Sequence, residues 1–165
     1  MDTPEIFSTL ARLPISSAQN LPQLTAEQLN AHPAGHPNSI AWLLWHSSRE
    51  VDAQLAPLTG QAQLWDEYAE RFDLGELGAS VGYGHSSAEA ARIKVNDQAL
   101  LLEYLEATLT ALGDYASTLT PTQLDEVIDR SWDPAVTRGV RLISIIDDAI
   151  AHVAQAAYAA GILTA

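Results

Sequence analysis

The sequence contains no cysteine, so the chain can form no disulfide, offer no thiolate to a metal and use no cysteine as a nucleophile. Any thiol chemistry must therefore involve the thiol of another molecule. Basic residues are also scarce, with 8 lysines and arginines against 21 acidic residues and a formal net charge of -13. This negative charge repels phosphate groups, which argues against nucleic acid and anionic membrane surfaces as partners.

Targeting and membrane-spanning signals are missing as well. The N-terminal stretch MDTPEIFSTLARLP lacks the basic start and apolar core of a signal peptide, so we expect a cytoplasmic protein. The apolar run at residues 142–163 approaches the length of a membrane-spanning helix. It contains Asp147, Asp148, His152 and Gln155, however, and each would need a partner in lipid. We interpret this run as a helix of the protein core.

What the sequence does contain is apolar periodicity. With 165 residues, 47% of them hydrophobic, the chain can bury one core, and we predict a single domain over residues 1–165. No segment alternates convincingly as a strand, so the prediction is an all-α four-helix bundle. Pro14 is expected to kink or shorten the first helix, and Asn38 is the expected N-cap of the second. The long helices are predicted at residues 4–20, after residue 38, at 97–119 and at 142–163.

A glycine-containing segment, residues 58–87, separates the second long helix from the third. We interpret it as a long excursion from the bundle rather than a bundle helix. Its Trp65, Tyr68 and Phe72 are expected to pack it onto the bundle, and the alternative is a lid over a site. Capping-box patterns at Thr25–Gln28 and Ser86–Glu89 predict two short helix starts.

Polar residues on the apolar helices are the candidate site. Asp148 and His152 are four residues apart, so their side chains lie on one face of the last helix. A buried carboxylate needs a partner, and a divalent cation would provide one. Together with His46 on the second helix, they would supply three nitrogen and oxygen ligands and leave a fourth position open. The alternative is structural: a hydrogen-bonded core histidine and a plain ion pair.

Two further interpretations of the polar residues stay open. Glu50 lies one turn after His46, which allows a dinuclear carboxylate site with Glu103 and Glu106 of the third long helix, although neither is followed by the histidine such sites require. His85 in GYGHSS directly precedes a helix start, where an anionic group of a substrate could bind. A loop histidine in a capping region is the simpler interpretation.

The segments SIAWLLWHSSREVD, GYGHS, RSWDPAVTRGVRL and DDAIAHVAQAAYAAGIL together resemble the DinB-like superfamily, in particular the branch related to mycothiol-dependent enzymes. The resemblance implies a bundle of up-down-down-up order, often dimeric, with a metal held by His46, Asp148 and His152. An acid at position 148 is similar to mycothiol-dependent maleylpyruvate isomerase, which has glutamate there. Ala154 departs from a glycine that is common in the family.

The resemblance also implies an activity. Zinc or nickel at these ligands would lower the pKa of an incoming low-molecular-weight thiol such as mycothiol, and the thiolate would attack a small electrophile in a transferase or isomerase reaction. Glu50, Asp52 or His85 would position or deprotonate the thiol.

Trp42 and Gln155 are the predicted contacts to the bound cofactor, with Trp42 helping to exclude water. Two alternatives remain: a non-catalytic bundle with a binding or stress-response role, and a metal-dependent hydrolase that uses bound water.

Overall fold

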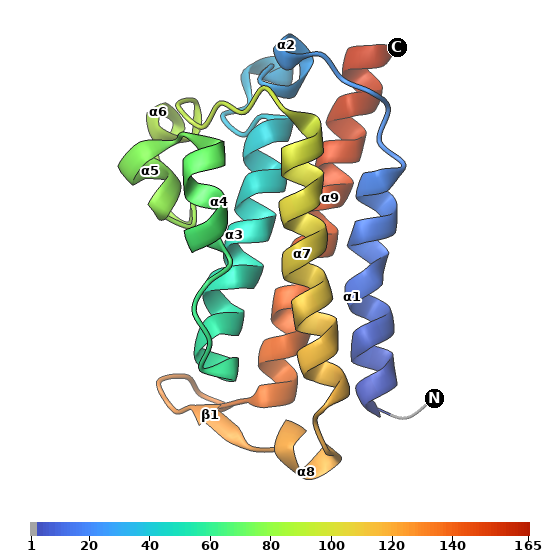
Figure 1. Cartoon of the computed structure of the whole chain (residues 1–165), viewed down its shortest axis with the longest axis vertical. Helices are drawn as coiled ribbons and strands as arrows, with labels where there is room; N and C mark the ends of the chain where they lie inside the picture. Colours follow the sequence, from blue (N-terminus) through green and yellow to red (C-terminus); the bar gives the residue numbers. More distant parts are fainter. Residues whose placement is uncertain (1–2) are drawn as a thin grey trace.

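The computed structural model describes residues 3–165 and shows four long helices side by side (Figure 1). In Figure 1 the first and last of them run upward and the two between run downward, which is the predicted up-down-down-up order. α1 and α3 each pack against both α7 and α9. The predicted all-α bundle is therefore confirmed. Its helices are α1 (Thr3–Gln19), α3 (Ile40–Thr59), α7 (Gln98–Ser117) and α9 (Arg138–Thr164).

Short elements fill the connections. Both predicted capping boxes are present, at Thr25–Gln28 and Ser86–Glu89. One short strand pair, which no alternating pattern in the sequence revealed, accompanies the helices: β1 pairs antiparallel with β2 between α8 and α9. These strands are too short for an alternating pattern to be visible in the sequence. The elements are α2 (Ala26–Leu29), η1 (Pro33–Gly35), α4 (Trp65–Phe72), α5 (Gly75–Ala79), α6 (Ser87–Ala90), α8 (Pro121–Leu124), β1 (Val127–Asp129) and β2 (Val136–Thr137).

Three details of the helix boundaries differ from the prediction. Ser39, not Asn38, caps α3, and its hydroxyl accepts a hydrogen bond from a backbone amide of the first turn. α9 begins at Arg138 because Thr137 caps it in the same way. α1 continues through Pro14, whose ring is buried. Packing of α1 against two neighbours outweighs the lost backbone hydrogen bond. Within residues 3–165 no helix combines the length and apolar character needed to cross a bilayer.

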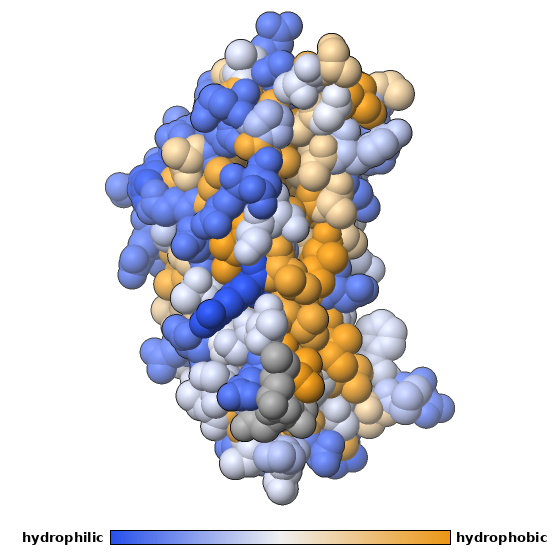
Figure 2. All heavy atoms as spheres, turned by 90° about the vertical axis from the view of Figure 1, so that its right-hand side faces the viewer, coloured by the Kyte–Doolittle hydropathy of each residue, from blue (hydrophilic) through white to orange (hydrophobic). Residues whose placement is uncertain are grey.

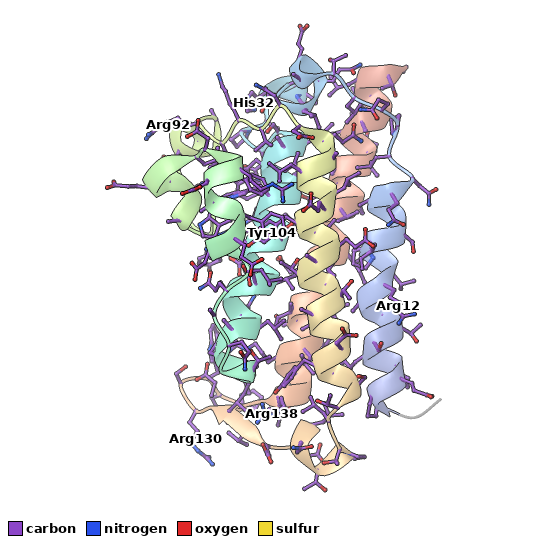
Figure 3. The ribbon with its side chains drawn as sticks, in the orientation of Figure 1. Arg12, His32, Arg92, Tyr104, Arg130 and Arg138 are labelled. Carbon is purple, nitrogen blue, oxygen red and sulfur yellow. The ribbon has the colours of Figure 1, made fainter. Side chains whose placement is uncertain are left out.

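The excursion, which comprises α4, α5, α6 and the turns between them, lies on one side of the bundle beside α3 and α7 (Figure 1). Trp65, Tyr68 and Phe72 are buried, and their ring centroids lie 4.7–5.8 Å from that of Tyr104. Figure 3 shows Tyr104 pointing from α7 toward this side of the molecule. The three aromatic residues thus pack the excursion onto the bundle, as the first interpretation predicted.

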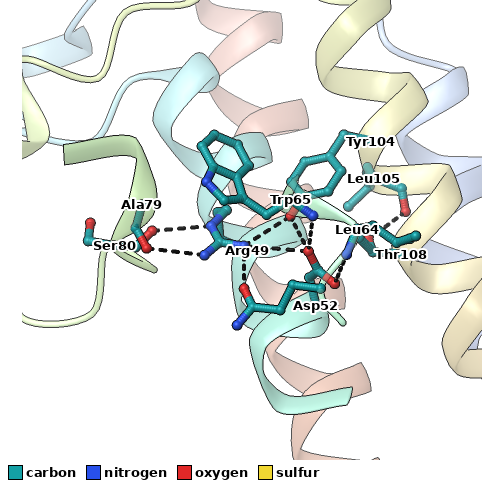
Figure 4. A network of polar contacts seen from close by, with 10 residues as sticks. Arg49, Asp52, Leu64, Trp65, Ala79, Ser80, Tyr104, Leu105 and Thr108 are labelled. Atoms are coloured by element: carbon teal, nitrogen blue, oxygen red, sulfur yellow. Dashed lines mark hydrogen bonds and ion pairs between the residues drawn. The ribbon is translucent and has the colours of Figure 1, made fainter. Parts of the chain in front are cut away.

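A buried ionic network strengthens this contact (Figure 4). The Asp52 carboxylate accepts hydrogen bonds from the backbone amides of Leu64 and Trp65 at 2.9 and 2.7 Å and from the Tyr104 hydroxyl at 2.6 Å. Burial raises the pKa of Tyr104, which keeps its hydroxyl protonated as a donor. Arg49 lies 3.4 Å from the same carboxylate and stacks over the Trp65 ring. The network fixes where the excursion begins on the surface of α3.

Candidate metal centre

Three side chains meet at the seam between α3 and α9, defined as the surface where these two helices pack together. His46 comes from α3 and Asp148 and His152 come from α9, and one potential ligand atom of each lies within 4.8 Å of the others. In a tetrahedral zinc site, two ligand atoms that are each about 2.1 Å from the metal lie roughly 3.4 Å apart. Small side-chain rotations would therefore let one cation contact all three residues.

Both histidines have the tautomer that a metal requires. The Nδ1 atom of His46 contacts the carbonyl oxygen of Val81, and Nδ1 of His152 lies 2.9 Å from the carbonyl oxygen of Asp148. Because a carbonyl oxygen only accepts hydrogen bonds, Nδ1 is the donor in each contact, and in the neutral form of each ring Nε2 is the atom available to a metal. Such hydrogen bonds to the remote nitrogen commonly orient histidine ligands.

The electrostatics also suit a cation. Burial is the main cause that lowers the pKa of His46, so the ring is neutral at pH 7, as ligation requires. Burial and the nearby Asp148 charge raise the pKa of Glu50, which shows that two carboxylates crowd the same region. The Asp148 side chain is 37% exposed and its Oδ1 atom lies 3.4 Å from Nδ1 of His152, as the ion-pair alternative predicted, whereas its Oδ2 atom is buried without a hydrogen-bond partner. A buried carboxylate oxygen without a partner is costly, and a divalent cation would compensate it.

A turn of the excursion holds His46 in place. The Val81 carbonyl oxygen accepts a hydrogen bond from Nδ1 of His46, and the next residue, Gly82, has a φ of +88°. A Cβ atom at Gly82 would lie 2.8 Å from His46 Nδ1, 3.0 Å from the Trp45 ring and 3.2 Å from the Trp42 ring. Trp42 stacks on His46 with centroids 4.3 Å apart and planes inclined by 21°. The imidazole is thus clamped between Trp42 and a turn that only glycine fits.

Arg49 holds this turn through hydrogen bonds to its backbone. Its guanidinium donates to the carbonyl oxygens of Ala79 and Ser80, each at 3.2 Å, and its side chain is 2% exposed (Figure 4). These carbonyls directly precede the Val81 carbonyl that orients His46. Arg49 therefore connects the ionic network to the ligand geometry. For Asp52, the contacts to four donors fit a structural role rather than the predicted handling of a thiol proton.

His85 has both ring nitrogens engaged. Ser80 donates its hydroxyl proton to the Leu77 carbonyl at 2.7 Å, so its oxygen accepts the Nε2 proton of His85 at 2.8 Å. The remaining nitrogen, Nδ1, accepts from the indole nitrogen of Trp42 at 3.4 Å. The geometry places His85 against Trp42, whose indole ring stacks on His46.

The other candidates separate clearly. Trp42 lies against the cluster, 6.2 Å from the His152 ring, whereas Gln155 is exposed one turn further along α9. The dinuclear alternative was wrong. Glu103 forms an exposed bidentate ion pair with Arg71 of α4, and Glu106 accepts a hydrogen bond from Gln19 of α1. Within residues 3–165 the three-ligand cluster is the one group that could hold a metal.

Comparison with known proteins agrees with this architecture. A sequence model of the DinB superfamily matches residues 17–156. The chain belongs to the DinB superfamily. Its fold is similar to the crystal structure of a conserved protein from Enterococcus faecalis, with a TM-score of 0.88 and 34% identity over 97% of this chain and 96% of that one. No curated protein matches the chain. DinB proteins typically bind a metal, and the ligand cluster lies within the matched range.

Sequence reasoning missed Val81, Gly82 and Arg49 as parts of the centre. A backbone carbonyl leaves no signature in the sequence, so Val81 could not be found. Gly82 stands in a glycine-rich turn, and Arg49 follows a run of large apolar residues. An arginine at that place is a signal of a buried partner, because arginine is rarely buried unpaired.

Proposed function

We propose that this DinB protein is a divalent-metal-dependent enzyme that joins a low-molecular-weight thiol, such as mycothiol, to a small electrophile or uses it to isomerise one. The observation that carries the proposal is the cluster of His46, Asp148 and His152, in which both Nδ1 atoms lie against backbone carbonyls and one carboxylate oxygen is buried without a partner. Zinc or nickel fits this ligand set. A bound divalent cation would lower the pKa of the thiol that reaches it and hold the thiolate.

The chain's own residues would perform the remaining tasks. Glu50 is half-buried beside Asp148, and its raised pKa makes it a suitable acceptor for the thiol proton. The sulfur lone pair then forms a bond to an electrophilic carbon, and the leaving group departs with the electron pair of the broken bond. In an isomerisation no group would leave. The sulfur would add to a carbon of a conjugated double bond while the π electron pair moves onto the electron-withdrawing group, and after rotation about the resulting single bond the pair would return and expel the sulfur. Trp42 shields the ligand cluster from water.

The chain contains no cysteine, which agrees with a reaction in which the thiol nucleophile comes from the co-substrate and not from the protein. We place the reaction in the cytoplasm, where small thiols are kept reduced.

Metal content is the decisive first measurement. Protein purified without a histidine tag should contain close to one equivalent of zinc or nickel by inductively coupled plasma mass spectrometry. His46→Ala and Asp148→Asn should lose it, because each removes a ligand. Asp147→Asn is the matched control: this neighbouring acid is exposed and outside the cluster, so the metal should remain. A wild-type protein that takes up no metal after incubation with zinc would contradict the proposal.

Turnover is then measured with an electrophile and with or without mycothiol. Product formation that requires the thiol, and that is lost in His46→Ala, would support the transferase. Turnover without thiol would indicate a hydrolase instead. Metal binding without turnover of any electrophile would favour the non-catalytic bundle.

We further propose a homodimer formed through exposed apolar residues that surround the exposed Asp147 on one face of α9. Val140, Ile143 and Ile150 are 52%, 56% and 37% exposed. Figure 2 shows a hydrophobic band along the side formed by α1 and α9. Exposed apolar bands of this kind commonly mark protein interfaces. Ile143→Asp should convert a dimer to a monomer in light scattering, whereas Tyr83→Asp on the excursion should not.

A further inference from the structure

A groove with a volume of about 630 Å³ lies on the seam between α3 and α9, one turn beyond the ligand cluster. The loop that precedes α3 contributes Pro33, Ala34, His36 and Asn38 to its lining. Cavities of 300–1,000 Å³ are typical of small-molecule sites. The lining includes Ala34, Leu43, Ala154, Tyr158, Ala159 and Ile162.

The groove and the ligand cluster share one face of each helix. On α9, Gln155 and Ala159 follow His152 by three and seven residues, which keeps all three on one stripe. On α3, Leu43 precedes His46 by three residues, again on one stripe. The rise of 1.5 Å per residue puts the start of the groove about 4.5 Å along the axis from the two histidines. A molecule in the groove would thus border the place where the thiol would bind.

The chemistry of the groove is that of an uncharged ligand. Although the chain has a formal net charge of -13, no aspartate, glutamate, lysine or arginine lines this cavity. A charged molecule would lose hydration there without gaining an ionic partner. The walls are apolar side chains, and the polar groups among them are Asn38, Gln155, His36 and the Tyr158 hydroxyl. Tyr158, which is 76% exposed, offers an aromatic face for stacking.

We propose that this groove binds the electrophilic substrate, and that the substrate is an uncharged molecule with an aromatic or similarly apolar body. This assignment of substrate class rests on the proposed function, because it assumes that an electrophile must reach a thiolate at the ligand cluster. The groove's own binding property does not depend on catalysis. It can be measured without metal or thiol, so the two proposals fail separately.

The binding test uses N-phenyl-1-naphthylamine, an uncharged fluorophore, with metal-free protein. Binding at one site, with displacement by 1-chloro-2,4-dinitrobenzene, is the expected result. Ala154→Phe places a ring in the groove and should weaken binding roughly tenfold or more, a change of at least about 1.4 kcal/mol. Ala157→Phe is the matched control, because this alanine is also exposed on α9 but lies outside the groove lining.

Circular dichroism and melting curves of both phenylalanine variants show whether α9 is intact. If Ala154→Phe fails to fold, Tyr158→Ala provides the second test, since removing an exposed side chain leaves the core unchanged. No binding by the wild type, or equal binding by the variants and the control, would overturn the proposal. It would also be overturned if the wild type is a dimer that Ala154→Phe dissociates while fluorophore binding remains unchanged, since the groove would then be an interface between two copies.

Discussion

Replacing Gly82 with alanine tests the clamp on His46 more directly than removing a ligand. The new Cβ atom would lie 2.8 Å from His46 Nδ1, closer than such contacts occur in proteins, and would also press on the rings of Trp42 and Trp45. A positive φ costs an alanine about 1–2 kcal/mol, and crowding in a packed region costs about 1–3 kcal/mol. The free energy of unfolding should therefore fall by about 2–5 kcal/mol. Loss of the Val81 hydrogen bond should weaken zinc binding about 10- to 100-fold.

Gly84→Ala separates these effects. Gly84 lies in the same turn with a φ of +77°, but a Cβ atom there would meet nothing within 4 Å. It should show the backbone cost alone and keep wild-type zinc affinity. Zinc affinity is measured by competition with a coloured chelator, and stability by denaturant unfolding in a metal-free buffer. If Gly82→Ala and Gly84→Ala bind zinc equally well, the turn does not orient His46 and the reasoning is refuted.

Two further predictions concern carboxylates with different surroundings. Asp52→Asn leaves the Arg49 guanidinium buried without an ionised partner, so unfolding in urea should show a loss of about 3–5 kcal/mol, whereas Glu103→Gln, which removes an exposed ion pair, should leave the midpoint almost unchanged. A comparable loss in both variants would contradict the structural role of Asp52. Glu50→Gln should stabilise the metal-free protein at pH 7. Because burial and Asp148 raise the folded-state pKa of Glu50, its ionised form opposes folding above that pKa, and the gain should vanish as the pH falls below the unfolded value of 4.5. If the stability gain of Glu50→Gln instead increased as the pH was lowered, the raised pKa of Glu50 would be contradicted.

The parts of the fold that could be predicted from the sequence are those with local signals. The long helices follow from apolar periodicity, and the placement of Asp148 and His152 on one face follows from a four-residue spacing. His46 could be joined to them only through its apolar surroundings and the family resemblance, because no local pattern links residues about a hundred positions apart. Glu50 and Asp52 show how this reasoning reaches its limit.

Both acids follow His46 on α3, and sequence proximity suggested the same role for each. The structure turns Asp52 toward α4 and α7, where it accepts from two backbone amides and a tyrosine, and leaves Glu50 near Asp148. Residues two positions apart on a helix lie on roughly opposite faces. Glu50 and Asp52 therefore differ because each face of α3 packs against a different neighbour. Which neighbour packs against each face depends on how the excursion docks on the bundle, and this docking cannot be predicted from the apolar periodicity of the sequence.

His46 is oriented by a backbone carbonyl, that of Val81, and not by a side chain. This affects how the centre could be re-engineered. Any residue can supply a carbonyl at position 81, whereas position 82 accepts only glycine without displacing three rings. If the excursion of a relative were grafted onto this bundle, His46 would keep its orientation only if the backbone at positions 81 and 82 followed the same path. The graft itself would carry none of the three ligands. The candidate metal centre can therefore be perturbed without changing any of its three ligands, by altering the turn that orients one of them.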